Sequence, residues 1–447
     1  MLFRFCLYGF LKNQRYFEPF LMLIFLDRGL SFFWIGVLIA IREATVNVLE
    51  IPSGAIADGW SRRSSLLVSF AAYIASFWMF AFSHEFGWFV LAMILYGVGE
   101  SFRTGTHKAL IFEWLRVQGR TEDRTLVYGF TRSWSQIGSA LSGVLAAICV
   151  LVTANYHAVF LFSIIPYLLN MINVGSYPAS LDGSHDRSLT IAGSAKIVGS
   201  TLRKSVRNPG LRRLMLESMG WEGVVNAVKD YLQPALAVLV VVWGVGTWFG
   251  HAVPEGLGSG QLADDPLVLA DSEPAVIREV AIMVGVVFPV LFVLSSIASR
   301  YSYRMVSAAG SAERAARGLW RWQMGIFLLL AIADIGGMIS FVVLAFVMMQ
   351  IVLNLWRPIL ISRFDERSTP EEGATILSIE SQSQRIATLI VAPLLGLMID
   401  WTAGSDGNGA FWPIGLLGFC SALAMWLTGS EKNETKSFDQ PPIHPPS

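Results

Sequence analysis

Apolar stretches of about 20 residues, long enough to cross the hydrocarbon core of a bilayer, recur along almost the whole chain. Polar or glycine-rich breaks divide these stretches into two sets of six. The first set starts near residues 5, 31, 64, 87, 125 and 156, and the second near residues 214, 276, 319, 338, 372 and 409. The pattern predicts an all-α membrane protein with twelve transmembrane helices in two six-helix bundles, residues 1–179 and 213–429.

The bulk composition agrees with a lipid environment. Hydrophobic residues make up 54% of the chain and charged residues 15%, with a mean hydropathy of +0.54, whereas soluble domains carry roughly 25% charged residues. The 33 basic residues equal the 33 acidic ones, so the charge balance indicates no nucleic-acid partner. The three cysteines lie far apart in apolar segments, which argues against a disulfide framework and against a metal site.

The distribution of Lys and Arg predicts the orientation, because basic residues resist translocation. The loops after spans two, four, eight and ten carry Arg62 and Arg63, then Arg116, Arg120 and Arg124, then Arg300 and Arg304, then Arg363 and Arg367. The opposite loops hold few basic residues, and the longest of them, residues 244–275, is acidic. We therefore expect both termini, a basic linker at 180–212 and a disordered tail at 430–447 on the cytoplasmic side of the plasma (inner) membrane.

Two short internal matches indicate that the halves are repeats. Residues 15–21 align with residues 230–236 at an offset of 215, with tyrosine, proline and leucine coinciding. Residues 54–57 align with residues 295–298 at an offset of 241. The two offsets differ by 26 residues, which corresponds to a 26-residue insertion within the acidic loop 244–275. Two parallel halves of this kind are typical of transporters.

Residues 54–63, which follow span two, resemble the loop signature of the major facilitator superfamily. The matching positions are Gly54, Asp58, Arg62 and Arg63. A glycine at 59 and a serine at 61 depart from the signature, so no gating role is carried over to them. The resemblance implies a cytoplasmic gate in which Asp58 docks at the start of span eleven, residues 368–372. The alternative is an ordinary loop that only sets topology.

Ionisable residues inside apolar spans are the strongest functional signal, because each costs roughly 2.5–3.5 kcal/mol at a helix centre unless it is paired or hydrated. In span four, three such residues lie on one helical face, and span seven carries a second polar face. The resemblance implies a central cavity lined by spans one, four, seven and ten. The predicted cavity residues are Arg15, Glu18, Glu100, Arg103, His107, Glu222, Asn226, Lys229, Asp230, Gln233, Asn354 and Arg357.

Acidic and basic residues nearly balance within the spans, which predicts mutual pairing. A buried carboxylate that lacks a cation takes up a proton instead, so we expect proton coupling through Glu18, Glu100, Glu222 or Asp230. Nearer the cytoplasmic ends, the predicted gate pairs involve Glu50, Arg132, Glu380 and Arg385. The alternative for each of these residues is a buried ion pair that only fixes helix register.

These patterns favour a monomeric secondary transporter that moves a small polar organic solute by alternating access. Two other classes stay open: a transporter-like sensor or scaffold without flux, and a polytopic membrane enzyme. The sequence has no HExxH, P-loop or GxSxG motif and no paired cysteine ligands, so we expect neither an enzyme nor a cofactor or metal.

Overall fold

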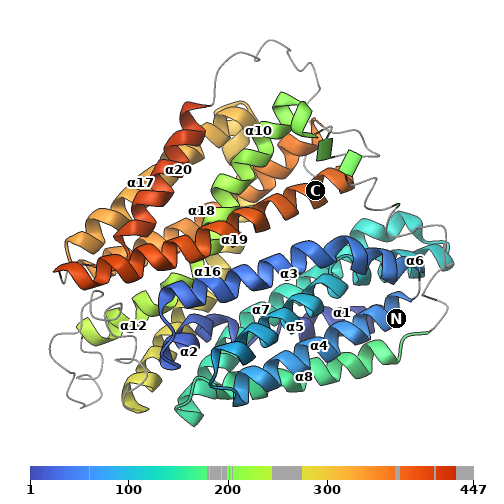
Figure 1. Ribbon diagram of the computed structural model, residues 1–447. Helices are drawn as coiled ribbons and strands as arrows, with labels where there is room; N and C mark the ends of the chain where they lie inside the picture. The colour runs from blue at the N-terminus through green and yellow to red at the C-terminus, as the bar shows by residue number, and fades with distance from the viewer. Residues whose placement is uncertain are drawn as a thin grey trace.

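The computed structural model describes residues 1–59, 61–178, 205–243, 274–367, 373–406 and 409–428, together with 181, 193, 199–200 and 202–203. These residues form helices and their connections, with no strand among them. Most of the predicted linker, the acidic loop and the tail lie outside the described residues. Figure 1 shows two groups of helices, the first built from the N-terminal half and the second from the C-terminal half.

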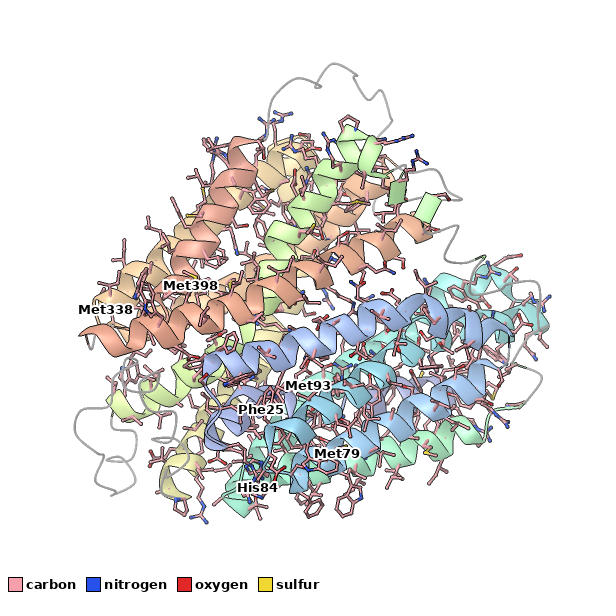
Figure 2. The ribbon with its side chains drawn as sticks, in the orientation of Figure 1. Phe25, Met79, His84, Met93, Met338 and Met398 are labelled. Carbon is pink, nitrogen blue, oxygen red and sulfur yellow. The ribbon has the colours of Figure 1, made fainter. Side chains whose placement is uncertain are left out.

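The N-terminal bundle begins at residue 2 and ends near residue 175. Its helices are α1 (Leu2–Lys12), α2 (Leu21–Asp27), α3 (Phe32–Gly59), α4 (Arg62–Phe82), α5 (Phe86–Arg103), α6 (Thr106–Val117), α7 (Arg124–Thr153) and α8 (Ala158–Gly175), with short turns η1 (Glu18–Phe20) and η2 (Thr121–Asp123). Aromatic side chains fill the core of this bundle, and Phe25 and Met93 lie among them in Figure 2. The Ser61 hydroxyl accepts a hydrogen bond from the Ser64 amide and so caps α4.

The C-terminal bundle repeats this order with a more irregular first helix. Its elements are α10 (Pro209–Ser218), η4 (Met219–Gly223), α11 (Val224–Val228), η5 (Lys229–Tyr231), α12 (Leu232–Val242), α16 (Pro274–Ala309), α17 (Ala312–Ile335), α18 (Ile339–Asp365), α19 (Gly373–Asp406) and α20 (Trp412–Leu427). Each predicted span has a helical counterpart in chain order. Among the described residues, nine helices are long and apolar enough to cross a membrane, so a total of twelve crossings stays a prediction.

The first helix of each bundle is interrupted near its middle. In the N-terminal bundle, helix stops at Lys12 and resumes only at Glu18. In the C-terminal bundle, the chain passes through the π-helix η4 and the 3-10 turn η5 before α12. Interrupted helices expose backbone polar groups inside a membrane, where irregular backbone is tolerated only next to protein or water.

The two bundles contact each other through α3 with α19 and through α7 with α16. At the α3–α19 contact, a Cβ on Gly36 would lie 2.4 Å from the Ala392 carbonyl oxygen, and one on Gly396 would lie 2.2 Å from that of Phe32. Only glycine fits such backbone approaches. Here Asp400 of α19 accepts hydrogen bonds from the amides of Phe32 (3.0 Å) and Phe33 (2.8 Å). Figure 1 shows α3 and α19 alongside each other, one from each bundle.

Candidate functional site

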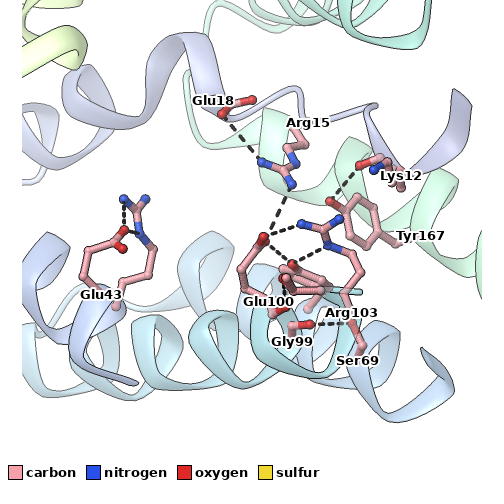
Figure 3. A network of polar contacts seen from close by, with 12 residues as sticks. Lys12, Arg15, Glu18, Glu43, Ser69, Gly99, Glu100, Arg103 and Tyr167 are labelled. Carbon is pink, nitrogen blue, oxygen red and sulfur yellow. Dashed lines mark hydrogen bonds and ion pairs between the residues drawn. The ribbon is translucent and has the colours of Figure 1, made fainter. Parts of the chain in front are cut away.

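A charged cluster in the N-terminal bundle is centred on Glu100 of α5 (Figure 3). The Tyr73 hydroxyl donates to Glu100 Oε2 at 2.5 Å, and Arg103 forms an ion pair with Oε1. Arg103 Nε also donates to the Tyr73 hydroxyl at 3.2 Å. Glu100 and Arg103 face the same way because they are three residues apart on one helix. The structure therefore brings together the two predicted residues, and it adds Tyr73, which the apolar pattern of α4 did not reveal.

Arg15 reaches this cluster from the break in the first helix. Its guanidinium lies 3.7 Å from a carboxylate oxygen of Glu18 and 3.7 Å from one of Glu100, which is ion-pair range but long for a hydrogen bond. Its Nε is buried without a hydrogen-bond partner. The Glu18 side chain is 51% exposed. Arg15 therefore keeps donor capacity that a bound anion would use.

His107, predicted on the same stripe, lies in a different environment. It sits in α6, beyond the Gly105 turn that ends the first segment of span four. Its ring stacks on Tyr8 with centroids 3.5 Å apart, and its Nε2 is 3.4 Å from the Tyr177 hydroxyl. The turn separates His107 from Glu100, so the extrapolation of one straight helical face from residue 100 to residue 107 fails at this point.

Glu43 links the two bundles. Arg42 donates to Glu43 Oε1 from Nε (3.0 Å) and Nη2 (2.8 Å), and Arg385 of α19 donates to Oε2 at 2.9 Å. Ser378, also on α19, donates to Glu50 at 3.4 Å. Arg385 and Glu50, two of the predicted gate residues, thus both lie at the contact of α3 with α19.

The C-terminal bundle holds a second charged cluster around Arg357 of α18. Arg357 Nη1 donates to Glu222 Oε2 at 2.8 Å and to Glu380 Oε1 at 2.7 Å, and Nη2 donates to Glu380 Oε2 at 3.1 Å. Ser218 and Gln384 also donate to Glu380. Glu222 receives one of these bonds, and its Oε1 is buried without a partner. Two buried carboxylates therefore share one guanidinium.

Stacked indole rings border this cluster. Trp221 and Trp356, which precede Glu222 and Arg357 in the sequence, lie with ring centroids 4.3 Å apart and planes inclined by 2°. Trp320 of α17 packs edge-on against Trp221, with centroids 4.6 Å apart. All three rings are buried. The packing of Trp221 against Trp356 thus holds the neighbouring Glu222 and Arg357 close to each other.

The interrupted helices of the two bundles touch at Gln233. Its amide donates to the Glu18 carbonyl oxygen at 2.9 Å and accepts from the Met22 amide at 2.8 Å. Asp230 lies nearby, within electrostatic range of Lys229, Arg42, Glu18 and Glu43. Glu18 and Gln233 were predicted as equivalent positions of a repeat, and here they are in contact across the pseudo-symmetric halves.

Other predicted residues have local partners or none in the described structure. Asn354 donates to the Gln350 carbonyl oxygen of its own helix at 2.8 Å. Asn226 is half-buried and Arg132 is exposed. Glu380, predicted as a gate residue, forms an ion pair with Arg357 of the C-terminal cluster.

The loop motif is only partly visible. Gly54 is exposed, and a Cβ there would meet no atom within 4 Å. Arg62 begins α4, and Arg63 donates to the Tyr177 carbonyl oxygen at 2.7 Å. The Asp58 side chain and the start of span eleven, residues 368–372, lie outside the described residues, so the docking of one on the other stays a prediction.

A network of five charged residues at the end of the C-terminal bundle is absent from the predicted site, and it includes Arg213, which donates to Glu217 at 2.9 Å. Arg363, whose side chain is 1% exposed, contacts Glu217 at 2.6 Å and Glu313 at 2.7 Å. Glu313 also contacts Arg367 at 2.5 Å. The one-turn spacing of Arg363 and Arg367 is a sequence signal for a charged helix face, but it does not reveal their partners on α10 and α17.

The opposite end of the N-terminal bundle carries a histidine cluster. His157 Nε2 is 2.8 Å from Asp27 Oδ2, and Arg28 Nε is 3.4 Å from His157 Nδ1. His84, visible at this end in Figure 2, contacts Arg28. Burial lowers the pKa of His157 below its ordinary value, although the hydrogen bond to Asp27 acts in the opposite direction. The neutral ring fits both neighbours, since Nδ1 faces a cation.

A sequence profile for the Major Facilitator Superfamily matches residues 13–379, which is most of the chain. The chain belongs to the Major Facilitator Superfamily. An uncharacterized MFS-type transporter from Bacillus subtilis (strain 168), YxaM, is 24% identical over 230 residues, 50% of this chain and 55% of that protein. The match spans about half the length of this relative.

Solved structures share the Major Facilitator Superfamily fold over nearly the whole chain. The nucleoside transporter NupG has a TM-score of 0.67 at 10% identity, with 96% of each chain covered. A D-xylose-proton symporter has a TM-score of 0.61 at 16% identity, with 95% of each chain covered. An inward-open structure of the xylose transporter XylE from E. coli has a TM-score of 0.55 at 15% identity, with 97% covered. These likenesses show the fold alone.

Membership of the Major Facilitator Superfamily confirms two predictions from the sequence. The chain is an integral, multi-pass α-helical membrane protein, and its family points to a transporter and not to an enzyme. Among the residues that the structure describes, no group of three or more His, Cys, Asp or Glu side chains is arranged to hold a metal ion.

Proposed function

We propose that the protein is a secondary active transporter that moves a small polar organic solute across the plasma (inner) membrane by alternating access, coupled to protons. The observation that carries this proposal is the contact between the interrupted first helices of the two bundles. Gln233 joins them at Glu18, and Arg15, Asp230 and Lys229 lie at the same breaks. Discontinuous helices at the interface of two repeats are where transporters place their substrates.

The charged groups around these breaks support a polar solute. Arg15 has a buried Nε without a partner, and Glu222 has a buried Oε1 without a partner. The first suits an anionic or hydrogen-bond-accepting group of the solute, and the second a hydrogen-bond donor or a proton. A wholly apolar solute would leave both groups unsatisfied.

Proton coupling is supported by the unequal charges of the C-terminal cluster. Glu222 and Glu380 together carry one more charge than Arg357 neutralises, and Glu380 takes most of the hydrogen bonds. A proton on Glu222 would remove the excess charge from a low-dielectric site. Among the four predicted proton carriers, Glu222 therefore fits best, whereas Glu100 is already held by Tyr73 and Arg103.

Alternating access is supported by the places where the bundles touch. The close contacts between α3 and α19, at Gly36, Gly396 and Asp400, lie at the end that the distribution of Arg predicts to be extracytoplasmic. Arg63 and the start of α1 lie together at the other end, where Arg4 donates to Ser176 O at 2.7 Å. We therefore infer that this state is closed at the extracytoplasmic ends of α3 and α19, and that the N-terminus is cytoplasmic.

The test is transport by the purified protein in proteoliposomes, with a panel of labelled sugars, nucleosides, amino acids and short peptides. We expect saturable flux of one solute class that increases when a pH gradient is imposed. Liposomes without protein and the variant Glu122→Gln, which alters an exposed carboxylate in the turn η2, serve as controls. Flux that ignores the pH gradient would reject proton coupling. Absence of flux for every class in both directions would favour a sensor or scaffold.

A further inference from the structure

Two basic side chains converge where α6 meets α7, at the end of the N-terminal bundle that is predicted to be cytoplasmic. Lys108 Nζ lies 5.4 Å from the ring centroids of both Phe112 and Tyr128. Arg124 Cζ lies 5.4 Å from the centroid of the same Phe112 ring. Lys108 and Arg124 are both exposed. Two cations from different helices are thus held against one pair of aromatic rings.

The neighbouring arginines have carboxylate partners, but these two cations have none. Arg116 pairs with Glu113 at 2.6 Å, and Arg120 pairs with Asp123 at 2.7 Å. In the part of the chain that the structure describes, neither Lys108 nor Arg124 makes a hydrogen bond or an ion pair. A ring face attracts a cation but does not cancel its charge. The repulsion between the two like charges is therefore left for an external anion to relieve.

The surroundings of the cations place them at the boundary between lipid and water. Leu126 and Phe130 follow Arg124 along α7. Leu126 is 71% exposed and Phe130 is 50% exposed, as expected for side chains that face acyl chains. Tyr128 lies between them and contacts Lys108. Tyrosine and basic residues are typical of the headgroup level of a membrane. A phosphate at this depth would therefore lie beside the two cations while its acyl chains cover the apolar face.

We propose that Lys108 and Arg124 form a binding site for the phosphate of an anionic phospholipid in the cytoplasmic leaflet. The charge complementarity is direct, because a guanidinium and an ammonium each donate charge-assisted hydrogen bonds to phosphate oxygens. The adjoining exposed apolar side chains favour a lipid over a free anion. This site is separate from the transport site and does not depend on the proposed function.

The test uses the full-length protein purified in detergent and titrated with phosphatidylglycerol or phosphatidylcholine. Bound lipid is counted by native mass spectrometry. We expect wild type to retain phosphatidylglycerol in preference to phosphatidylcholine, and Lys108→Gln with Arg124→Gln to weaken that binding roughly 30-fold at low salt. The matched control is Arg116→Gln with Arg120→Gln, which removes the same two charges from the same segment and should weaken binding much less.

The proposal would be overturned if wild type retained the two lipids equally, or if both double variants lost binding equally. Displacement of the lipid by low concentrations of inorganic phosphate would also overturn it, because that result would indicate a phosphate site. The conservative pair Lys108→Arg with Arg124→Lys tests charge separately from folding. This double variant is expected to bind phosphatidylglycerol as wild type does.

Discussion

At the scale of single residues, the position of a charge along a helix could be predicted from the sequence, but its partner could not. Glu100 and Arg103 pair within one turn, so their spacing was enough. Glu222, Arg357 and Glu380 come from three different spans, and their pairing depends on the depth and rotation of each helix. Periodicity fixes neither of these quantities.

Glu222 provides the sharpest prediction for the transport mechanism. In Glu222→Gln, we expect accumulation driven by a pH gradient to fall about tenfold or more, while exchange at equal pH continues, because the amide imitates the protonated carboxyl. Glu100→Gln should impair both modes, since it leaves Arg103 and Arg15 without their shared counter-charge. Both are measured by solute counterflow and by gradient-driven uptake. Unchanged coupling in Glu222→Gln would exclude this residue as the proton carrier.

His157 predicts a dependence of stability on pH. Because burial lowers its pKa, the unfolded chain binds the proton more readily than the folded chain. The contribution of His157 to the free energy of unfolding is therefore fully present when the pH is above the ordinary histidine pKa of about 6.5. This contribution decreases as the pH falls below that value. We expect the melting temperature of wild type to fall between neutral pH and pH of about 5.5, and His157→Gln to fall less. Identical pH profiles would contradict this role.

At the scale of elements, the helices themselves were predictable because each apolar stretch has to satisfy its backbone internally. The interruptions were harder to place. Residues 13–17 and 229–231 contain several polar side chains, but such side chains also occur in the continuous helix α18. The π-helical turn at Met219–Gly223 has no sequence signature, and it positions Trp221 and Glu222 against α18 and α19.

The glycines between α3 and α19 predict how the bundles separate. Gly36→Val or Gly396→Val would force side-chain atoms into the opposite backbone, so the extracytoplasmic ends of the two helices should move apart. Spin labels at the exposed positions 34 and 401 report this separation by pulsed electron resonance. Gly325→Val on α17 is the control, because a Cβ there would meet no atom within 4 Å. Equal distance distributions in all three variants would argue against a tight contact.

At the scale of the whole molecule, the two bundles are joined by a capping interaction. Asp400 of one bundle accepts hydrogen bonds from the first amides of α3 in the other. Such a cap contributes about 0.5–2 kcal/mol and is lost when the ends separate. Sequence could not reveal it, because the residues are far apart along the chain.

Asp400→Asn is expected to shift the population away from the state in which these helix ends are in contact by roughly 2- to 30-fold, the range that corresponds to the loss of one cap. The same pair of spin labels measures the shift. Asp334→Asn is the control, because Asp334 caps the start of α20 within its own bundle. That variant should lower the melting temperature without changing the balance between states. A similar population shift in both variants would mean that general destabilisation is responsible.

The parallel indole rings of Trp221 and Trp356 give this protein an intrinsic optical reporter. Trp221 directly precedes Glu222 in the sequence, and Trp356 directly precedes Arg357. A change that breaks the Glu222–Arg357 ion pair should therefore also shift the two stacked rings relative to each other. Ultraviolet emission should then respond to acidification and to a solute that binds at this site, without any dye or radiolabel. An unidentified solute can therefore be sought by adding candidate compounds to the solubilised protein and recording its fluorescence, with Trp221→Phe as the reference variant that lacks the stacked pair.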